Sequence, residues 1–191
     1  MSDITCKPKR LDLSTAVSVE HVDIDYIADI RTLKRDSYMK LYAQYATDSE
    51  TAAFNDMLES SKFAENLYRS INKRQVVGAF LESRMVGIAC WAESRDNQLT
   101  GSLRFLFVDP IFTRCGIGRT LLQSLEANVL TDSARQFSIR TVVQSMGFFE
   151  KAAYATTSYG ALPVGNHEAF AVAFMRKSIA DEPALISTLH H

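Results

Sequence analysis

The segment from Phe107 to Leu122 constrains the fold of this chain more than any other, because a strand, a turn and a helix follow one another in it directly. It begins inside a short apolar run, Leu103 to Val108, which suits a buried strand, and Asp109-Pro110 ends that strand because proline has no N–H to donate. After Gly116, apolar residues recur at helical spacing, which predicts a helix from about Gly118 to Leu130. A loop of this kind turns free backbone N–H groups and the positive end of a helix dipole toward one point, and that point suits a phosphate.

Length and composition indicate one ordinary globular domain. The chain has 191 residues, of which 47% are hydrophobic and 23% are charged, and this is enough for one substantial core. The net charge of −1, with both signs interspersed, argues against the basic surface of a nucleic-acid-binding or membrane-anchored protein. No N-terminal run has the length of a signal peptide, and no run approaches the roughly 18 apolar residues of a membrane helix. We therefore expect a cytoplasmic domain over residues 15–179, with tails at 1–14 and 180–191, and neither nucleic acid nor membrane as a partner.

The cysteine and histidine pattern predicts neither a disulfide nor a metal site. Cys6, Cys90 and Cys115 are odd in number and lack metal-ligand spacing, and His190-His191 form a frayed end. Cys115 just precedes the predicted helix, where a thiolate would be stabilised. It is therefore either a nucleophile or, as we prefer, a spacer beside the loop.

The first part of the chain is expected to be mostly helical, and strands follow it. After a short strand at Thr15–Val19, apolar residues at helical spacing predict one helix or a bent helix pair over Val22–Tyr45. Thr47 to Glu50 has the form of a capping box, and helical periodicity continues from there to Asn72.

Three further strands are predicted from apolar runs and alternation. Gln75–Leu81 and Met85–Ala92 are close enough for an antiparallel hairpin, and Phe137–Val143 alternates as a strand does. With the run that ends at Val108, these segments predict a sheet that follows the helices.

The loop between strand and helix resembles the coenzyme A pyrophosphate loop of the GNAT superfamily of acyl-CoA-dependent N-acetyltransferases. The resemblance lies in the order Val-x-Pro, five further residues, Gly-Ile-Gly-Arg and a pair of leucines, from Val108 to Leu122. The family's loop reads Gln/Arg-x-x-Gly-x-Gly/Ala, and this chain has Thr113 at the first position. Because the family binds pyrophosphate mainly through main-chain N–H groups, this change weakens one contact, and Arg114 or Arg119 can supply the charge.

Three further stretches are similar to elements of the same family, so that the resemblance runs from about Val76 to Ile179. Met85-Val86-Gly87 resembles the start of the second strand of the family's hairpin. Ser145 to Tyr154 resembles its second coenzyme element, commonly Ala-x-x-Phe-Tyr-Glu-Lys-x-Gly-Phe, with the match at Phe149-Glu150-Lys151. Ala169 to Met175 resembles its last strand.

This resemblance implies an α/β fold of the α+β kind, with a mixed, largely antiparallel sheet, helices on both faces, and a V-shaped opening beside the strand that ends at Val108. It implies an enzyme that transfers an acetyl group from acetyl-CoA to a primary amine of an unidentified acceptor, a small molecule or a peptide, without a metal. It leaves a homodimer open. The residues implied to contact the coenzyme are Phe107, Val108, Arg114, Cys115, Gly116, Ile117, Gly118, Arg119, Thr120 and Phe149.

The catalytic base is not fixed by the resemblance. The family often uses a glutamate on the central strand, and Leu103 to Val108 contains no acid. Glu93, at the end of the preceding strand, is the first substitute, followed by Glu82 and His167. Arg104 stands where an acid is expected, and it is either a surface residue or a ligand for an acidic group of the acceptor.

The general acid is also missing from the pattern. The family's tyrosine, whose hydroxyl can protonate the departing thiolate, falls on Phe149. Tyr154 and Tyr159 are the alternatives, but both follow the helix that presents Phe149. We therefore expect a slow enzyme in which water protonates the thiolate.

Two other functions remain open. The same fold can hold acyl-CoA as a sensor or structural ligand without turnover, and an unrelated phosphate-binding interaction protein can share the Gly116-Ile117-Gly118 turn alone. Binding of the coenzyme separates the second from the others. Release of free coenzyme A thiol in the presence of amines separates an enzyme from a sensor.

Overall fold

One seven-stranded sheet organises the part of the chain that the computed structural model describes, residues 12–93, 100–131, 136–164 and 168–178. The strand order is β1-β2-β3-β4-β5-β7-β6, and every neighbouring pair is antiparallel except β4 and β5. The mixed, largely antiparallel sheet expected from the resemblance is confirmed. The strands are β1 Val17–His21, β2 Val76–Leu81, β3 Arg84–Glu93, β4 Thr100–Val108, β5 Gln136–Val142, β6 Ala155–Val164 and β7 Glu168–Ser178.

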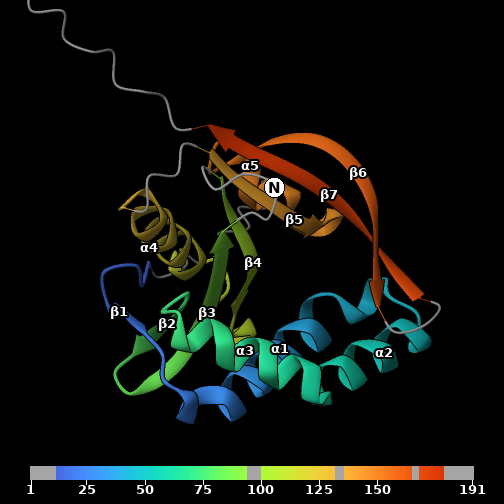
Figure 1. Ribbon diagram of the computed structural model, residues 1–191, viewed down its shortest axis with the longest axis horizontal. Helices are drawn as coiled ribbons and strands as arrows, with labels where there is room; N and C mark the ends of the chain where they lie inside the picture. The colour runs from blue at the N-terminus through green and yellow to red at the C-terminus, as the bar shows by residue number, and fades with distance from the viewer. Residues whose placement is uncertain (1–11, 94–99, 132–135, 165–167, 179–191) are drawn as a thin grey trace, which may run out of the picture.

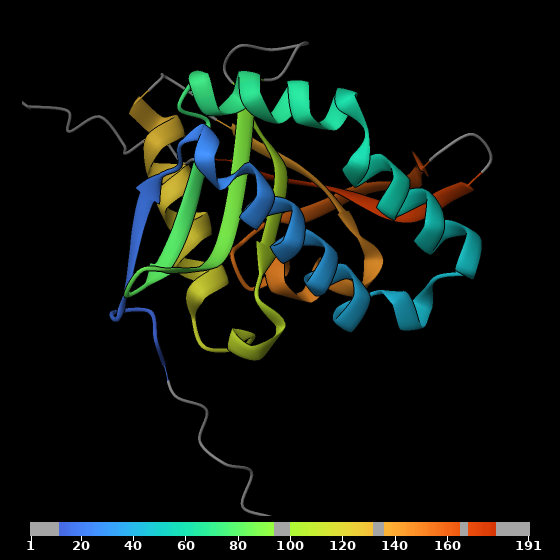
Figure 2. The same cartoon turned by 90° about the horizontal axis from the view of Figure 1, so that it is seen from below.

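Helices cover both faces of this sheet. Figure 1 shows α4 on one side of β2 to β4 and the N-terminal helices on the other, and Figure 2 shows α1 crossing in front of the strands with α4 behind them. Among the described residues, none of the helices combines the length and apolar character that a membrane crossing needs. The α-helices are α1 Ile27–Leu41, α2 Asp48–Glu59, α3 Ser61–Asn72, α4 Ile117–Thr131 and α5 Met146–Glu150, and short 3-10 turns are η1 Ile24–Tyr26, η2 Ala43–Tyr45, η3 Pro110–Phe112 and η4 Val143–Ser145.

The capping box predicted at the start of α2 is present. The Thr47 hydroxyl accepts from the Glu50 N–H at 3.1 Å, and the Glu50 carboxylate accepts from the Thr47 N–H at 2.7 Å, so two orphan donors of the helix are satisfied. The helical segment to Asn72 is broken at Ser60, whose extended backbone ends α2 and whose hydroxyl caps α3.

Two apolar layers hold the helices to the sheet. On one face, α4 buries Ile117, Leu121 and Leu125 against β3, β4 and β5. On the other face, α1 and α3 bury Ile30 and Leu67, among others, against β2 and β3. The helix repeat of 3.6 residues and the strand repeat of two both put apolar side chains on the buried faces, as the sequence pattern indicated.

The first strand begins later than predicted. Residues 13–16 form a turn in which the Ala16 N–H donates to the Leu13 carbonyl at 3.0 Å, so Thr15 and Ala16 are not in the strand. β1 then runs from Val17 to His21 along β2 as the edge of the sheet.

β4 and β5 are paired for only part of their length. Partner pairs extend from Thr100–Gln136 to Leu103–Ile139, and then pairing stops although β4 continues to Val108 and β5 to Val142. The two strands therefore part after Leu103 and Ile139. Their place side by side in one sheet agrees with the predicted arrangement.

A β-bulge lies where the two strands part. On the β3 side, Cys90 is opposite Phe105 and Trp91 is opposite Leu103, so Arg104 is an extra residue in β4. A bulge bends its strand and increases the local twist, which accounts for the divergence of β4 from β5. Beyond the bulge, Phe105 and Phe107 pack toward α1 and α3.

Candidate functional site

The turn that follows β4 is held at its start by Asp109. One carboxylate oxygen of Asp109 accepts from the Ile111 N–H at 2.9 Å, and the other accepts from Arg84 at 2.6 Å. Pro110 occupies the first position of η3, where a missing N–H costs nothing. The end of β4 and the start of the loop are thus fixed to the β2–β3 turn.

The loop then places consecutive N–H groups at the start of α4. Arg114 and Gly116 have left-handed backbones, with φ of 66° and 89°. Within the described part of the chain, no acceptor takes a hydrogen bond from the N–H groups of residues 114–118, whereas those of Arg119 and Thr120 donate to the Gly116 carbonyl. Successive unpaired N–H groups at a helix start form a concave anion site, called the N–H cradle below.

Gly118 leaves space beside this cradle. A Cβ built at Gly118 would lie 3.3 Å from the Phe148 ring and 3.6 Å from a Val108 methyl. Phe148 comes from α5, so the end of β4, the start of α4 and α5 meet at this glycine. A side chain here would crowd the ring next to the cradle.

The N-terminal segment supports the other side of the loop. The Leu13 N–H donates to the Cys115 carbonyl at 2.9 Å, and the Asp12 carboxylate lies so close that a Cβ on Gly116 would be 2.6 Å from it. Hydrogen bonding to Ser14 is the main cause that lowers the pKa of Asp12. Gly116 is therefore required both by its positive φ and by this close approach.

Positive charge gathers where β4 and β5 part. Arg104 is the bulge residue of β4, and Arg140 follows the last paired residue of β5. Desolvation and then the charge of Arg104 lower the pKa of Arg140, although its side chain reaches solvent. Both guanidinium groups lack a salt bridge to any described residue.

A third cation, Lys34 of α1, is buried behind β4. Its side chain is 5% exposed, and its ammonium lies 4.1 Å from the centre of the Phe105 ring, 4.8 Å from that of Phe63 and 5.0 Å from that of Phe107. Burial lowers the pKa of Lys34 from 10.5 to about 8, while Cys90 acts in the opposite direction. The rings offer cation–π contacts, which favour the charged form.

Comparison with known proteins identifies the family. A family model described as an acetyltransferase (GNAT) domain matches residues 42–164, and these cover more than half of the chain. The chain belongs to the GNAT acetyltransferase family. Membership of this family indicates that the reaction is, in general terms, acetyl transfer.

Solved GNAT structures agree with this fold. A GCN5-related N-acetyltransferase from Rhodopseudomonas palustris is 20% identical with a TM-score of 0.73, over 85% of this chain and 95% of that one. The PaiA N-acetyltransferase of Thermoplasma acidophilum, in complex with coenzyme A, is 17% identical with a TM-score of 0.69, over 85% and 99%. YncA of Salmonella typhimurium, with its cofactor acetyl-CoA, is 15% identical with a TM-score of 0.65, over 88% and 96%. No curated protein matches the sequence.

The structure brings most of the expected coenzyme residues of this GNAT domain to one place. Residues 114–118 carry the N–H cradle, and Val108 lies beside Gly118. The side chains play different parts. Ile117 is 1% exposed in the core, Thr120 turns its hydroxyl to its own helix, and Phe107 packs toward Lys34.

Phe149 is set apart from the cradle, in the core. Its side chain is 5% exposed and its ring makes edge contacts with Phe148 and Tyr154. The neighbouring Phe148 is the partly buried ring that faces Gly118. The sequence alignment with the family did not distinguish these two adjacent rings.

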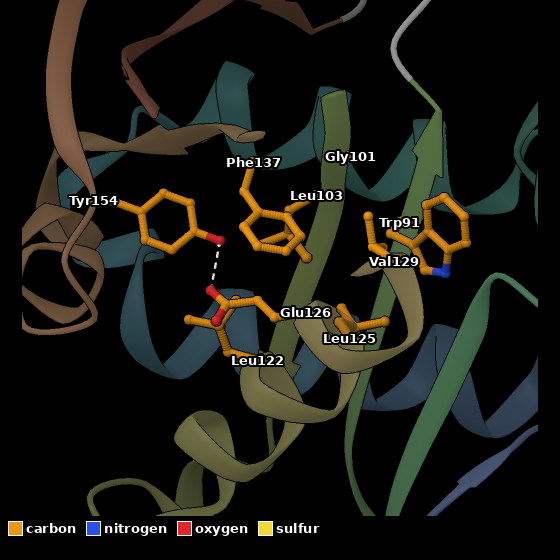
Figure 3. A pocket seen from close by; sticks show the side chains of 9 residues that line it. All are labelled: Trp91, Gly101, Leu103, Leu122, Leu125, Glu126, Val129, Phe137 and Tyr154. Carbon is orange, nitrogen blue, oxygen red and sulfur yellow. Dashed lines mark hydrogen bonds between the residues drawn. The ribbon is translucent and has the colours of Figure 1, made fainter. Parts of the chain in front are cut away.

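Tyr154, one alternative for the general acid, lines a small pocket on the α4 face and is hydrogen-bonded there. Its hydroxyl donates to Glu126 at 2.9 Å (Figure 3). The ammonium of Lys177 donates to the same carboxylate at 2.7 Å. Burial, and then the charge of Glu126, raise the pKa of Tyr154 far above its ordinary value. The cavity measures about 10 Å³, which is room for no more than one water molecule.

Among the described residues, the remaining catalytic candidates lie away from the bulge. Glu93 is the exposed last residue of β3 and pairs with Gly101, on the closed side of the parting. Glu82 lies in the β2–β3 turn, near the opposite end of β4. Tyr159 of β6 is 67% exposed, and His167 lies outside the described residues.

No three His, Cys, Asp or Glu side chains of the described residues gather as a metal site would require. Cys115 has a free thiol that approaches the Thr113 carbonyl at 3.7 Å, and its own carbonyl holds the N-terminal segment. These contacts are those of a spacer in the loop.

Proposed function

We propose that this GNAT protein transfers an acetyl group from acetyl-CoA to a primary amine. The observation that carries the proposal is that two features of a coenzyme site lie along the same strand, β4. The strand parts from β5 at Leu103, and at its far end it leads into the N–H cradle of residues 114–118. Val108 lies four residue steps after Arg104, about 13 Å at the rise of a strand. A long thin ligand with an anionic end fits this path.

The residues present fit acetyl-CoA. The cradle and the α4 dipole suit its pyrophosphate, and the edge of β4 beyond Leu103 has lost its pairing with β5, so backbone groups there are free for an extended arm. When bound, acetyl-CoA supplies an activated acetyl thioester. Gly118 keeps the entrance beside Phe148 and Val108 clear.

The amine must reach the thioester without its extra proton. Free amines of this kind have pKa values of roughly 8 to 10, so most are protonated at neutral pH. The positive charges of Arg104, Arg140 and Lys34 disfavour a further cation between β4 and β5, which lowers the pKa of an amine bound there. This field can replace part of the work of a general base, and Glu93 through water remains the first proposed base.

A second candidate function is an acyl-CoA-binding module without turnover. It is favoured by the absence of a free general acid at these two positions, because Phe149 has no hydroxyl and the Tyr154 hydroxyl donates a hydrogen bond to Glu126. Under the enzyme proposal water protonates the departing thiolate, at a cost in rate on the order of 10²-fold. A cytoplasmic location and a homodimer stay predictions of the sequence.

A screen for thiol release tests the proposal. Purified protein and acetyl-CoA are mixed with amino acids, polyamines, aminoglycosides and peptides in turn, and free coenzyme A thiol is measured. We expect thiol release that depends on one class of amine and yields an acetylated product by mass. Tight coenzyme binding with no amine-dependent release in any class would favour the binding module instead.

A further inference from the structure

Two arginines occupy matching places at the point where β4 and β5 part. Leu103 and Ile139 are the last residues that pair, and Arg104 and Arg140 are the next residue of each strand. Arg104 is also the extra residue of the bulge, so its position depends on the feature that opens the sheet. Both side chains are exposed.

Some cations of the described chain are held by an acidic partner, and Arg104 and Arg140 are not among them. Arg84 is paired with Asp109 and Lys177 with Glu126, while Arg35 is paired with Glu59. The side chains of Arg104 and Arg140 form no salt bridge and no hydrogen bond with a described residue. Arg104 instead acts on Arg140 as a like charge.

The buried Lys34 adds to the same positive field. Burial raises the pKa of the Cys90 thiol, on the α1 face of β3, and the charges of Lys34 and Arg104 both act to lower it. Three cations from α1, β4 and β5 thus surround the bulge, although bringing like charges together is unfavourable without a compensating anion. The structure supplies no such anion from its described residues.

The helix layer bounds this space on one side. The hydroxyl of Tyr42, just after α1, hydrogen-bonds the hydroxyl of Ser145, in the turn after β5. The end of α1 is thereby tied to the far end of β5, on the face where Arg140 lies. An acceptor in this space meets two fixed elements, which favours a small molecule over a folded chain.

We propose that Arg104 and Arg140 bind the carboxylate of the acceptor, so that the acceptor is an amino acid. The inference rests on the proposed acetyl transfer and names its substrate class. A planar guanidinium binds a planar carboxylate through two parallel hydrogen bonds, and two such groups can hold it from both strands. The α-amine of the same molecule then lies within a few bonds of the anchor, beside the edge of β4.

Matched ligands and matched variants test this assignment. The twenty amino acids are compared with their amino-acid amides as acceptors, in the wild-type protein and in Arg104→Gln, Arg140→Gln and Arg104→Lys. Arg176→Gln is the control, because Arg176 is an exposed arginine of β7 that pairs with Ser138, on the closed side of the parting. It makes the same change in net charge.

We expect at least one amino acid to exceed its amide in kcat/KM by tenfold or more. Arg104→Gln and Arg140→Gln should each lower kcat/KM for the acid by roughly 10- to 100-fold, the usual strength of a charge-assisted hydrogen bond. The amide should lose much less, because it loses only the effect of the arginine charge on the pKa of the amine. Arg104→Lys should recover part of the loss, and the KM for acetyl-CoA should not change. Equal rates for acids and amides, or a preference that survives both variants, would overturn the inference.

Binding of the products separates this inference from the proposed function. N-acetyl amino acids and their amides are titrated calorimetrically into protein saturated with coenzyme A, which needs no turnover. Carboxylate-dependent binding that is lost in Arg104→Gln supports the anchor even if no amine releases thiol, and only the acetyl-transfer proposal would then fail. Thiol release without any carboxylate preference in binding would refute the anchor and leave acetyl transfer in place.

Discussion

Replacing the buried Lys34 by methionine should stabilise the protein at neutral pH. Lys34 is 5% exposed, lies between α1 and β4, and has aromatic rings rather than a carboxylate around its ammonium. Methionine has a similar length and shape and no charge, so the change tests the cost of the buried charge with little change in volume.

The magnitude follows from the pKa. It falls from 10.5 in the unfolded chain to about 8 in the folded one, and at about 1.4 kcal/mol for each pKa unit the buried charge costs about 3 kcal/mol. The contacts with Phe63, Phe105 and Phe107 offset part of this, since each favours the ammonium. We therefore expect Lys34→Met to raise the free energy of unfolding by about 1 to 3 kcal/mol at pH 7.

The pH dependence gives the sharper test. Between pH 8 and 10.5 the unfolded chain keeps the Lys34 proton and the folded protein does not, so the wild type gains stability as pH rises through this window. The advantage of Lys34→Met should therefore be full below pH 8 and shrink toward zero by pH 10.5. Arg104 and Cys90 also lie near Lys34 and add to the pH dependence of stability in both proteins. The test therefore uses the difference in the free energy of unfolding between Lys34→Met and the wild type at each pH.

Urea unfolding at pH 7, 8, 9 and 10 measures this difference. Lys40→Met, at an exposed lysine of the same helix, controls for the loss of one positive charge. A Lys34→Met protein that is less stable than the wild type at pH 7, with no change in the difference as pH rises, would show that the rings more than compensate for burial.

Four other substitutions have definite expected outcomes. Gly116→Ala should destabilise the protein by more than about 1 kcal/mol in thermal unfolding, because the φ of Gly116 is 89° and the new Cβ would lie 2.6 Å from Asp12. Gly118→Ala should destabilise it less, because the nearest atom to the new Cβ is 3.3 Å away. The reverse order of the two losses would contradict the loop geometry. Phe149→Tyr should lower the unfolding midpoint and leave turnover unchanged, because the new hydroxyl enters a core site that is 5% exposed; a faster enzyme would show that it reaches the thiolate. Tyr154→Phe should cost about 1 kcal/mol through the lost hydrogen bond to Glu126 and leave thiol release intact, and a large fall in rate in a stable variant would make Tyr154 the general acid.

The parts of the fold that the sequence predicted well depend on local chemistry. Asp109-Pro110 and the glycines at 116 and 118 mark the end of a strand and the start of a helix through backbone restrictions that act within a few residues. The capping box from Thr47 to Glu50 is local in the same sense. Such signals need no knowledge of distant contacts.

The elements that the sequence analysis did not name depend on tertiary pairing. β6 has Thr156, Thr157 and Ser158 where a strand signal would need apolar alternation, and it forms at the sheet edge by pairing with β7. The left-handed backbone of Arg114 had no signal, because glycine is the usual residue for that conformation. The break at Ser60 did have one, since serine is a preferred helix N-cap.

The cations of the candidate site belong to this second group. Arg104 could be singled out because it stands on the central strand, but Arg140 and Lys34 acquire meaning only from the register of β4 with β5 and from the packing of α1. Sequence spacing alone cannot bring residues 34, 104 and 140 together. The anchor for a carboxylate is therefore a product of the fold.

The central claim is that the N–H cradle and the opening beside β4 form one acetyl-CoA site, and a calorimetric titration of acetyl-CoA tests it most directly. We predict micromolar binding, roughly −7 to −9 kcal/mol, to the wild type. Gly118→Val should weaken binding at least tenfold, because its side chain meets Phe148 and Val108 beside the cradle. Gly147→Val, where a Cβ has nothing within 4 Å, should bind as the wild type does. Absence of binding to the wild type at millimolar acetyl-CoA, or unchanged affinity in a folded Gly118→Val protein, would contradict the account.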